Sequence, residues 1–297
     1  MACTGKEIKM IGAIIGDIAG SRFEWHNHKS KKFDFFGRGC KPTDDSIMTI
    51  AIAKAVMESR DRYDGVDVEK LSENAAVWMR KIGKHYPDCG YGGTFYKWII
   101  GVIDDPYGSY GNGAAMRVSA AADVARNLEE AKTLARAVTV VTHDHPESIR
   151  AVEALAGAIY LAREGMDMTE IRYYIMDYYD LDFTLDSIRK GYRFDVSCQG
   201  SVPVAFQAFL ESDSFEDAIR NAISVGGDSD TIAAITGALA EAFYGVPGWM
   251  ADKAIGMLNH HLREIVQEFY INSNVYLGTR FAEAGEIEEE TPGNMCE

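Results

Sequence analysis

Cysteine is scarce in this chain and shows no pairing. The five cysteines lie far apart, at positions 3, 40, 89, 198 and 296, and none belongs to a C-x-x-C pair. An odd number of scattered cysteines argues against a disulfide framework and against a zinc ribbon. A reducing compartment suits such a chain best, so we expect a cytoplasmic protein.

Long uncharged apolar runs are also missing. No stretch of about 18 such residues occurs, so neither a transmembrane helix nor a membrane partner is expected. Near the N-terminus a short apolar run ends at Ile15, and Gly16 and Asp17 follow at once. This pattern does not resemble a secretory signal peptide.

Positive charge is the third thing that the sequence lacks. Its 30 lysines and arginines face 45 aspartates and glutamates, which gives a formal net charge of −15. Such a surface repels nucleic acid, and the three lysines between residues 29 and 32 stand alone, so nucleic acid is not expected as a general partner. An anionic substrate would need positive charge supplied locally by metal ions, helix N-termini or a single arginine.

Helical periodicity, by contrast, is abundant. Asp67 is a predicted N-cap, Pro146 begins a predicted helix that ends near Gly165, and another begins at Ser214. Apolar residues also keep helical spacing from Gly248 to Tyr270.

Strand-like alternation, repeats and linkers are not found. The sequence therefore predicts an all-α protein with a single compact, orthogonal helical domain over residues 1–282. The last segment, residues 283–297, is acidic, and we expect it to be a disordered tail.

Gly12, Gly16 and Gly20 recur at four-residue intervals in IGAIIGDIAG. A dinucleotide-binding turn is one interpretation, but the spacing is not G-x-G-x-x-G, and Asp17 would lie where the phosphates belong. On a helix the three glycines lie on one face and permit close packing of a second helix.

Two segments place paired aspartates where an apolar helix is expected to begin. Each alone is explained by capping, because threonine and aspartate cap helices well and carboxylates in the first turn complement the helix dipole. The side chains concerned are Thr43, Asp44, Asp45, Asp228, Asp230 and Thr231.

Considered together, the two segments favour a metal site. Four carboxylates brought close together would repel one another strongly, and hard divalent cations would remove that repulsion. Mg²⁺ and Mn²⁺ prefer oxygen ligands, and no histidine–cysteine set with zinc spacing competes. We therefore expect a binuclear Mg²⁺ or Mn²⁺ site at helix N-termini.

Two further segments are candidates for substrate contacts. In residues 109–117 small residues let the backbone approach a ligand and Arg117 could add charge, although a simple turn into a small-residue helix fits equally well. In residues 142–146, His143 could contact a ligand or cap a helix. Direct metal ligation by His143 is not expected, because the rest of the site offers oxygen.

The order of these motifs resembles the ADP-ribosylglycohydrolase family, which includes the enzyme that reactivates dinitrogenase reductase. The resemblance spans roughly residues 8 to 245. The matching motifs are G-D-x-x-G-S-x-x-E from Gly16, T-D-D-S from Thr43, G-N-G-A-A-M-R from Gly111, T-H-x-H-P from Thr142 and G-G-D-S-D-T from Gly226.

The resemblance implies an all-α fold and a binuclear centre surrounded by the six threonines and aspartates named above. It implies that Glu24 lies beside the metals, and that the segment around Asn112, the residue His143 and, more loosely, a glycine pair contact ADP-ribose. Tyr110 is the best candidate for an aromatic facing adenine. The predicted ligand contacts are Gly92, Gly93, Ser109, Tyr110, Gly111, Asn112, Gly113, Met116, Arg117 and His143.

The implied activity is hydrolysis of the glycosidic bond between ADP-ribose and an acceptor, either a protein side chain or a small molecule. The metals would bind the distal ribose, water would attack, and either Glu24 or Asp45 would accept its proton. A phosphodiesterase or pyrophosphatase using the same metals, and a non-catalytic ADP-ribose-binding protein, are the alternatives. The linkage to the acceptor is not readable from the sequence.

Overall fold

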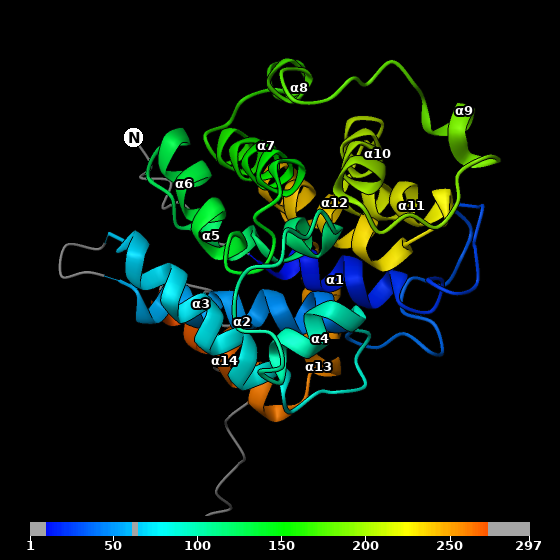
Figure 1. Ribbon diagram of the computed structural model, residues 1–297. Coiled ribbons are helices and arrows are strands. Elements are labelled where there is room, and N and C mark those ends of the chain that lie inside the picture. The colour runs from blue at the N-terminus through cyan, green and yellow to red at the C-terminus, as the bar shows by residue number, and fades with distance from the viewer. Residues whose placement is uncertain (1–9, 61–64, 273–297) are drawn as a thin grey trace, which may run out of the picture.

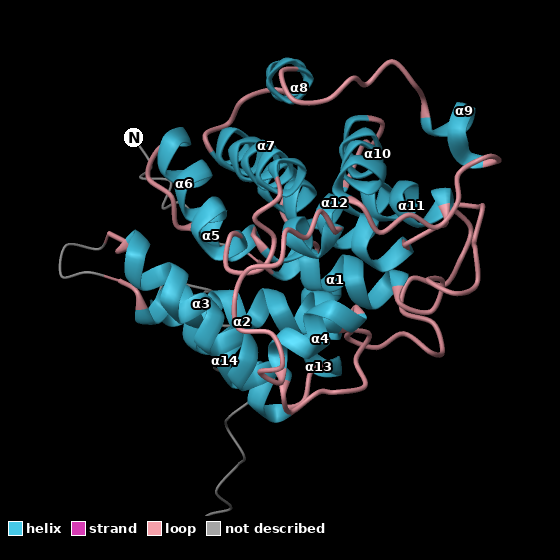
Figure 2. Cartoon of the chain, in the orientation of Figure 1, coloured by secondary structure: helices cyan, strands magenta, loops and turns pink. Residues whose placement is uncertain are grey.

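The computed structural model describes residues 10–60 and 65–272. Within these ranges the chain is helical and forms no β-strand, only two isolated β-bridges, which confirms the predicted all-α class (Figure 2). The elements are α1 (Ile11–Gly20), α2 (Asp44–Glu58), α3 (Val68–Gly83), α4 (Gly93–Ile99), the 3₁₀ helix η1 (Asn112–Arg117), α5 (Ser119–Asp123), α6 (Leu128–Thr139), α7 (Pro146–Arg163), α8 (Met168–Met176), α9 (Leu185–Arg189), α10 (Cys198–Leu210), α11 (Phe215–Val225), α12 (Ser229–Tyr244), α13 (Gly248–Met257) and α14 (His260–Asn272).

Two buried helices, α1 and α12, lie at the centre of the fold. Figure 1 shows α2, α3 and α14 packed together on one side of this pair, and α7, α10 and α11 on the other. Every residue of α1 is buried, so this helix has no face toward solvent. The N-terminal end of α12 and the C-terminal end of α1 therefore meet inside the protein.

Close packing along the glycine face of α1 is confirmed. A Cβ added at Gly16 would lie 2.0 Å from the carbonyl oxygen of Ala233 in α12. One added at Gly20 would lie 2.6 Å from the Cα of Asp230, and Gly12 faces the α12 backbone in the same way. The two backbones thus touch directly, and the crossing brings the end of α1 to the start of α12.

The predicted helix starts are largely confirmed. Asp67 caps α3 through its side chain, α7 begins at Pro146, and Ser214 caps α11. Gly165, with φ of +85°, follows the end of α7.

The helical spacing from Gly248 to Tyr270 belongs to two helices, α13 and α14. The chain forms two helices here, because Leu258 leaves the helical conformation with ψ of 145° and Asn259 caps α14 by accepting a hydrogen bond from the Leu262 N–H at 3.1 Å. The apolar spacing continues across this break, so spacing alone does not reveal it.

The predicted acidic tail lies outside the described residues. The domain boundary at residue 282 and the tail 283–297 therefore stay predictions. Among the described helices, none has the length and apolar character needed to cross a membrane.

The glycine crossing makes a prediction for stability. Replacing Gly16 with alanine should lower the free energy of unfolding by about 1–3 kcal/mol, because the methyl group must push two packed backbones apart. Urea unfolding followed by circular dichroism measures the change. Gly256→Ala in α13 is the matched control: a Cβ there meets nothing within 4 Å, so this variant should be as stable as the parent or slightly more so. Equal stability of both variants would show that α1 and α12 tolerate separation.

Candidate functional site

Thr43 begins α2 and links it to α1. Its hydroxyl accepts a hydrogen bond from the Asp45 N–H at 3.4 Å, as an N-cap does, and donates one to Asp17 at 2.6 Å. The capping interpretation therefore holds for this threonine. Because the hydroxyl is used inside the protein, Thr43 is not among the residues that line the neighbouring cavity.

Asp17 is a residue to which the sequence analysis gave no role. It is fully buried in α1 and accepts hydrogen bonds from the backbone N–H groups of Thr43, at 2.9 Å, and Ser46, at 3.0 Å, and from both of their hydroxyls. Burial raises the pKa of Asp17, and the bonds from Ser46 and Thr43 oppose that rise. Because both carboxylate oxygens face these donors, Asp17 orients the start of α2.

The start of α12 is built differently. Asp228 occupies the N-cap position, but its side chain makes no capping bond. It accepts a hydrogen bond from the side-chain amide of Asn112 at 2.6 Å instead. Capping therefore does not explain this aspartate, which faces the cavity as a predicted ligand would.

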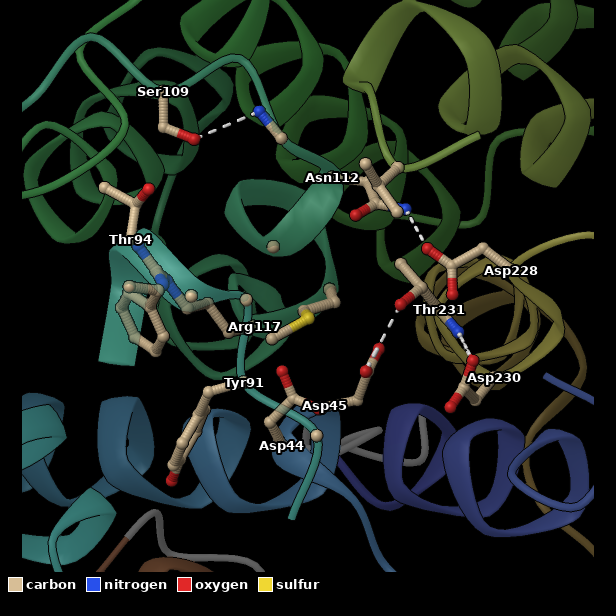
Figure 3. A pocket seen from close by; sticks show the side chains of 18 of the residues that line it. Asp44, Asp45, Tyr91, Thr94, Ser109, Asn112, Arg117, Asp228, Asp230 and Thr231 are labelled. Carbon is tan, nitrogen blue, oxygen red and sulfur yellow. Dashed lines mark hydrogen bonds between the residues drawn. The ribbon is translucent and has the colours of Figure 1, made fainter. Parts of the chain in front are cut away.

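A hydrogen bond joins the two helix starts. The Thr231 hydroxyl at the start of α12 donates to a carboxylate oxygen of Asp45 in α2, at 3.2 Å. The other oxygen of Asp45 is buried and has no hydrogen-bond partner. Figure 3 shows Asp45, Thr231 and Asp230 gathered on one side of the cavity.

Five carboxylates meet here, and we call them the acidic cluster: Glu24, Asp44, Asp45, Asp228 and Asp230. Single oxygens of Glu24, Asp228 and Asp230 lie within 4.8 Å of one another, and the same is true of Asp17, Asp45 and Asp230. Among the described residues, no lysine or arginine forms an ion pair with a member of the cluster.

The electrostatics of the acidic cluster are those of crowded, desolvated anions. Burial, and then the charge of Asp17, raise the pKa of Asp44 to about 8. Burial also raises the pKa values of Asp45 and Asp230 well above the ordinary value. The pKa of Glu24, which is half-buried, rises to about 7 through burial and the charge of Asp228.

These residues fit a hard divalent cation. The donor set offers only carboxylate and hydroxyl oxygen, which Mg²⁺ and Mn²⁺ prefer. A buried carboxylate oxygen without a partner, as in Asp45, costs free energy unless a positive group meets it. The cluster could therefore hold metal.

A cavity of about 500 Å³ opens beside the acidic cluster. Figure 3 shows the carboxylates on one side and Thr94 and Ser109 on the opposite side. The predicted site residues that line it are Glu24, Asp44, Asp45, Gly92, Gly93, Ser109, Gly111, Asn112, Gly113, Met116, Arg117, His143, Asp228, Asp230 and Thr231.

Tyr110 is the one predicted ligand contact that is not part of this lining, and its contact with adenine stays a prediction. It does not line the cavity; its side chain is exposed, and its ring packs against His145 with centroids 5.4 Å apart. The backbone explains this orientation, because the Tyr110 carbonyl accepts the Cys198 N–H at 2.9 Å and Gly111 forms a β-bridge with Ser197. The aromatic and apolar residues that do line the cavity and that the sequence analysis missed are Trp25, Tyr91, Phe95, Tyr107, Phe194 and Val196.

Arg117 places a buried positive charge under the cavity wall. It is fully buried, donates to the Thr142 hydroxyl at 2.7 Å and lies over the Phe95 ring at 5.2 Å. Its Nε and Nη1 have no hydrogen-bond partner. Burial lowers the pKa of Arg117 to about 10, so it remains charged near neutral pH.

His143 stands beside this arginine as a neutral group. Burial and the charge of Arg117 lower the pKa of His143 well below its ordinary value. Added Cβ atoms at Gly111 and Gly113 would each lie 3.5 Å from its Nε2. No side chain of these glycines comes between His143 and the cavity, and His143 belongs to the cavity lining although it is only 4% exposed.

A buried acidic cluster of oxygen ligands beside a cavity with a buried arginine is typical of metal-dependent hydrolases that act on phosphorylated sugars or nucleotides. The sequence profile of the ADP-ribosylglycohydrolase family matches residues 9–276, and the chain belongs to this family. The resemblance seen in the motifs is thereby confirmed, and the chain is a hydrolase of this family.

Named relatives agree with this assignment. The chain is 25% identical to ADP-ribosylhydrolase ARH3 of Gallus gallus, over 81% of the chain and 86% of the relative. It is 29% identical to ADP-ribosylarginine hydrolase Tri1 of Pseudomonas putida (strain GB-1), over 88% and 76%. Identity to the ADP-ribosyl-[dinitrogen reductase] glycohydrolase of Rhodospirillum rubrum is 25%, over 70% and 72%.

A solved structure of an ADP-ribosylglycohydrolase-related protein complex shares the fold. The TM-score is 0.59 at 21% identity, and the match covers 90% of this chain and 97% of that chain.

The role of Asp17 can be tested with one substitution. Asp17→Asn keeps an oxygen acceptor but turns an N–H₂ group toward the hydroxyl of Thr43, so the start of α2 should shift. We expect activity and metal affinity to fall roughly 10- to 100-fold, the usual effect of losing a group that orients metal ligands. The rise in Tm caused by Mg²⁺ should shrink accordingly.

Asp67→Asn at the exposed N-cap of α3 is the control, because asparagine caps about as well as aspartate. An Asp17→Asn protein with parental activity and a parental Mg²⁺-induced rise in Tm would contradict the orienting role.

Proposed function

We propose that the protein hydrolyses the glycosidic bond between ADP-ribose and an acceptor, with two Mg²⁺ or Mn²⁺ ions held by Asp44, Asp45, Asp228, Asp230 and Thr231. One observation carries the proposal: the acidic cluster and Arg117 line the same cavity. The names of the relatives, which are ADP-ribosyl hydrolases, support the same substrate class.

In a protein with a strongly negative net charge, an anionic ligand needs a local positive charge, and the cavity provides one. Arg117 supplies positive charge within a chain of net charge −15, and the imidazole of His143, which also lines the cavity, lies next to it. The backbone at Gly111 and Gly113 is accessible beside that imidazole. We therefore place the diphosphate toward Arg117 and the distal ribose toward the acidic cluster.

Bound cations would supply two things at the cluster: ligation of the ribose hydroxyls and polarisation of a water molecule. The chain itself must orient these groups and move a proton. Asp17 and Asn112 hold two of the cluster's segments, through Thr43 and Asp228 respectively.

Glu24 is the stronger candidate for the proton acceptor. It lies half-buried in the cavity wall, and one of its oxygens is within 4.8 Å of oxygens of Asp228 and Asp230, so it can reach a water molecule held at the cluster. Asp45 is already engaged by the Thr231 hydroxyl. As the bond from C1″ to the acceptor breaks, the water oxygen bonds to C1″, and its proton passes through Glu24 to the departing acceptor.

An ADP-ribosylated protein or a small-molecule conjugate would serve as the substrate.

The alternative activities differ in their products. A phosphodiesterase or pyrophosphatase would release AMP from ADP-ribose, and a non-catalytic binding protein would release nothing. The cytoplasmic location expected from the cysteine pattern remains part of this proposal.

Metal removal tests the proposal directly. EDTA should abolish release of ADP-ribose from ADP-ribosylated protein, and Mg²⁺ or Mn²⁺ should restore it, because the buried carboxylates offer only hard oxygen ligands. Mass spectrometry of the products identifies intact ADP-ribose. Full activity in a metal-free preparation, or AMP as the product, would refute the proposed reaction.

Glu24→Gln separates binding from chemistry. The amide cannot accept a proton, so kcat should fall by about 10²- to 10⁴-fold while the affinity for ADP-ribose, measured by calorimetry, stays near that of the parent. Glu69→Gln, on the exposed side of α3, serves as the control and should leave kcat unchanged. If Glu24→Gln turns over at the parental rate, Asp45 becomes the leading proton acceptor.

A further inference from the structure

Two consecutive glycines form the turn that leads into α12 and presents Asp228. Gly226 has φ of +69° and Gly227 has φ of +74°, a region that residues with a Cβ rarely adopt. Ordering two glycines costs conformational entropy, because their backbones are the least restricted of all residues. Asp228 follows them directly, and its side chain makes no capping bond that would fix the turn. Apart from the bond that Asn112 donates, the direction of this carboxylate therefore depends on what holds the glycine turn from outside.

Two polar side chains from the loop after α1, those of Asn27 and Lys29, hold this turn, and we call them the brace. The side-chain oxygen of Asn27 accepts the Gly227 N–H at 2.7 Å. The Lys29 ammonium donates to the carbonyl oxygen of Val225, the last residue of α11, and to that of Tyr192 at 3.0 Å. The brace thus restrains the backbone at both ends of the glycine turn.

The glycine turn fits closely against the brace. A Cβ added at Gly226 would lie 2.5 Å from the Oδ1 of Asn27 and 3.0 Å from the Nζ of Lys29. One added at Gly227 would lie 2.6 Å from a ring carbon of Tyr192. The brace and this ring therefore occupy the space into which the turn would otherwise move.

Capping of α11 alone does not account for Lys29. A lysine at the C-terminal end of a helix is stabilised by a bond to a terminal carbonyl and by the helix dipole. Lys29 makes a second bond outside that helix, to the Tyr192 carbonyl. Burial and the charges of Arg193 and Arg189 lower the pKa of this lysine, so its charge is held there at a cost. Among the described residues, no carboxylate forms an ion pair with it to offset that cost.

We propose that the brace positions Asp228 for cation binding: it fixes the backbone of the glycine turn, and the turn directs the carboxylate into the acidic cluster. This inference rests on the proposed function, in which Asp228 is a metal ligand. Asn27 and Lys29 act through the backbone of other residues, so they are positioning residues. Glu24 lies three positions before Asn27, in the same loop. One of its oxygens is within 4.8 Å of oxygens of Asp228 and Asp230, so the brace also joins two segments that supply the cluster.

The affinity for Mn²⁺, measured by calorimetry on the metal-free protein without substrate, tests the brace. Lys29→Met has a side chain of similar length but no donor, and it should bind Mn²⁺ about tenfold more weakly, as expected when a group that orients metal ligands is lost. Lys29→Arg can donate to both carbonyls and should restore most of the affinity. Asn27→Ala should weaken binding about three- to tenfold, the effect of one hydrogen bond. The values of kcat/KM for release of ADP-ribose should follow the same order.

A double substitution and a matched control separate positioning from simple attachment of the loop. Because both side chains hold one turn, Asn27→Ala combined with Lys29→Met should bind Mn²⁺ little more weakly than Lys29→Met alone, whereas independent effects would multiply. Lys31→Met is the control, because it removes the same charge from the same loop. The Lys31 ammonium pairs with Asp217 in α11 and does not contact the turn. This variant should keep the parental Mn²⁺ affinity and kcat/KM even if its Tm falls.

Amide hydrogen exchange in the metal-free protein measures the turn itself. Exchange in the peptide that contains Gly226 and Gly227 should be about tenfold faster in Lys29→Met and Asn27→Ala than in the parent, and unchanged in Lys31→Met. Asn27 is exposed, so its substitution leaves the fold intact.

Four results would overturn the brace: parental exchange in both variants, parental Mn²⁺ affinity in Lys29→Met, no recovery in Lys29→Arg, or losses that multiply in the double variant. If the parent itself binds no Mn²⁺ or releases no ADP-ribose, the proposed function fails instead. The exchange rates then decide by themselves whether the brace holds the glycine turn.

Discussion

The direct contact between the backbones of α1 and α12 is the constraint on which the rest of the structure depends. Glycine at positions 16 and 20 lets α1 lie against the first turns of α12, next to Asp230. The same helix carries Asp17, which binds the first turn of α2. Two helix starts far apart in the sequence are thus fixed relative to one another, and the acidic cluster forms where they meet.

Burying several carboxylates next to one another costs free energy. Burial and mutual repulsion raise the pKa values of Asp44, Asp45 and Asp230, so the charged forms are disfavoured without a cation. Neutral donors, among them Asn112 and Thr231, hold the carboxylates in place without neutralising them. Such a site destabilises the fold locally but is suited to binding hard cations. Functional sites often break the rule that buried charges are paired.

Much of this arrangement was predictable from the sequence, and the exceptions have physical causes. Paired aspartates before apolar helices predicted the helix starts that the structure brings together. The role of Asp17 was not predicted. Its partners lie far from it in the sequence, and a single acidic residue in an apolar helix does not indicate which residues it will contact. The exposed position of Tyr110 was not predicted, because it depends on the bridge between Gly111 and the segment before α10. Nothing local indicates that Phe194 stacks on Trp25.

The cavity is electrically asymmetric, and this asymmetry gives a bound substrate its direction. At one end the charged Arg117 lies beside His143, which burial keeps neutral through a lowered pKa. The acidic cluster lines the same cavity. A diphosphate placed at Arg117 and a ribose placed at the carboxylates match these charges, whereas a diphosphate set against the carboxylates would meet like charge. This polarity is why the proposed function directs C1″ of ADP-ribose toward the acidic cluster.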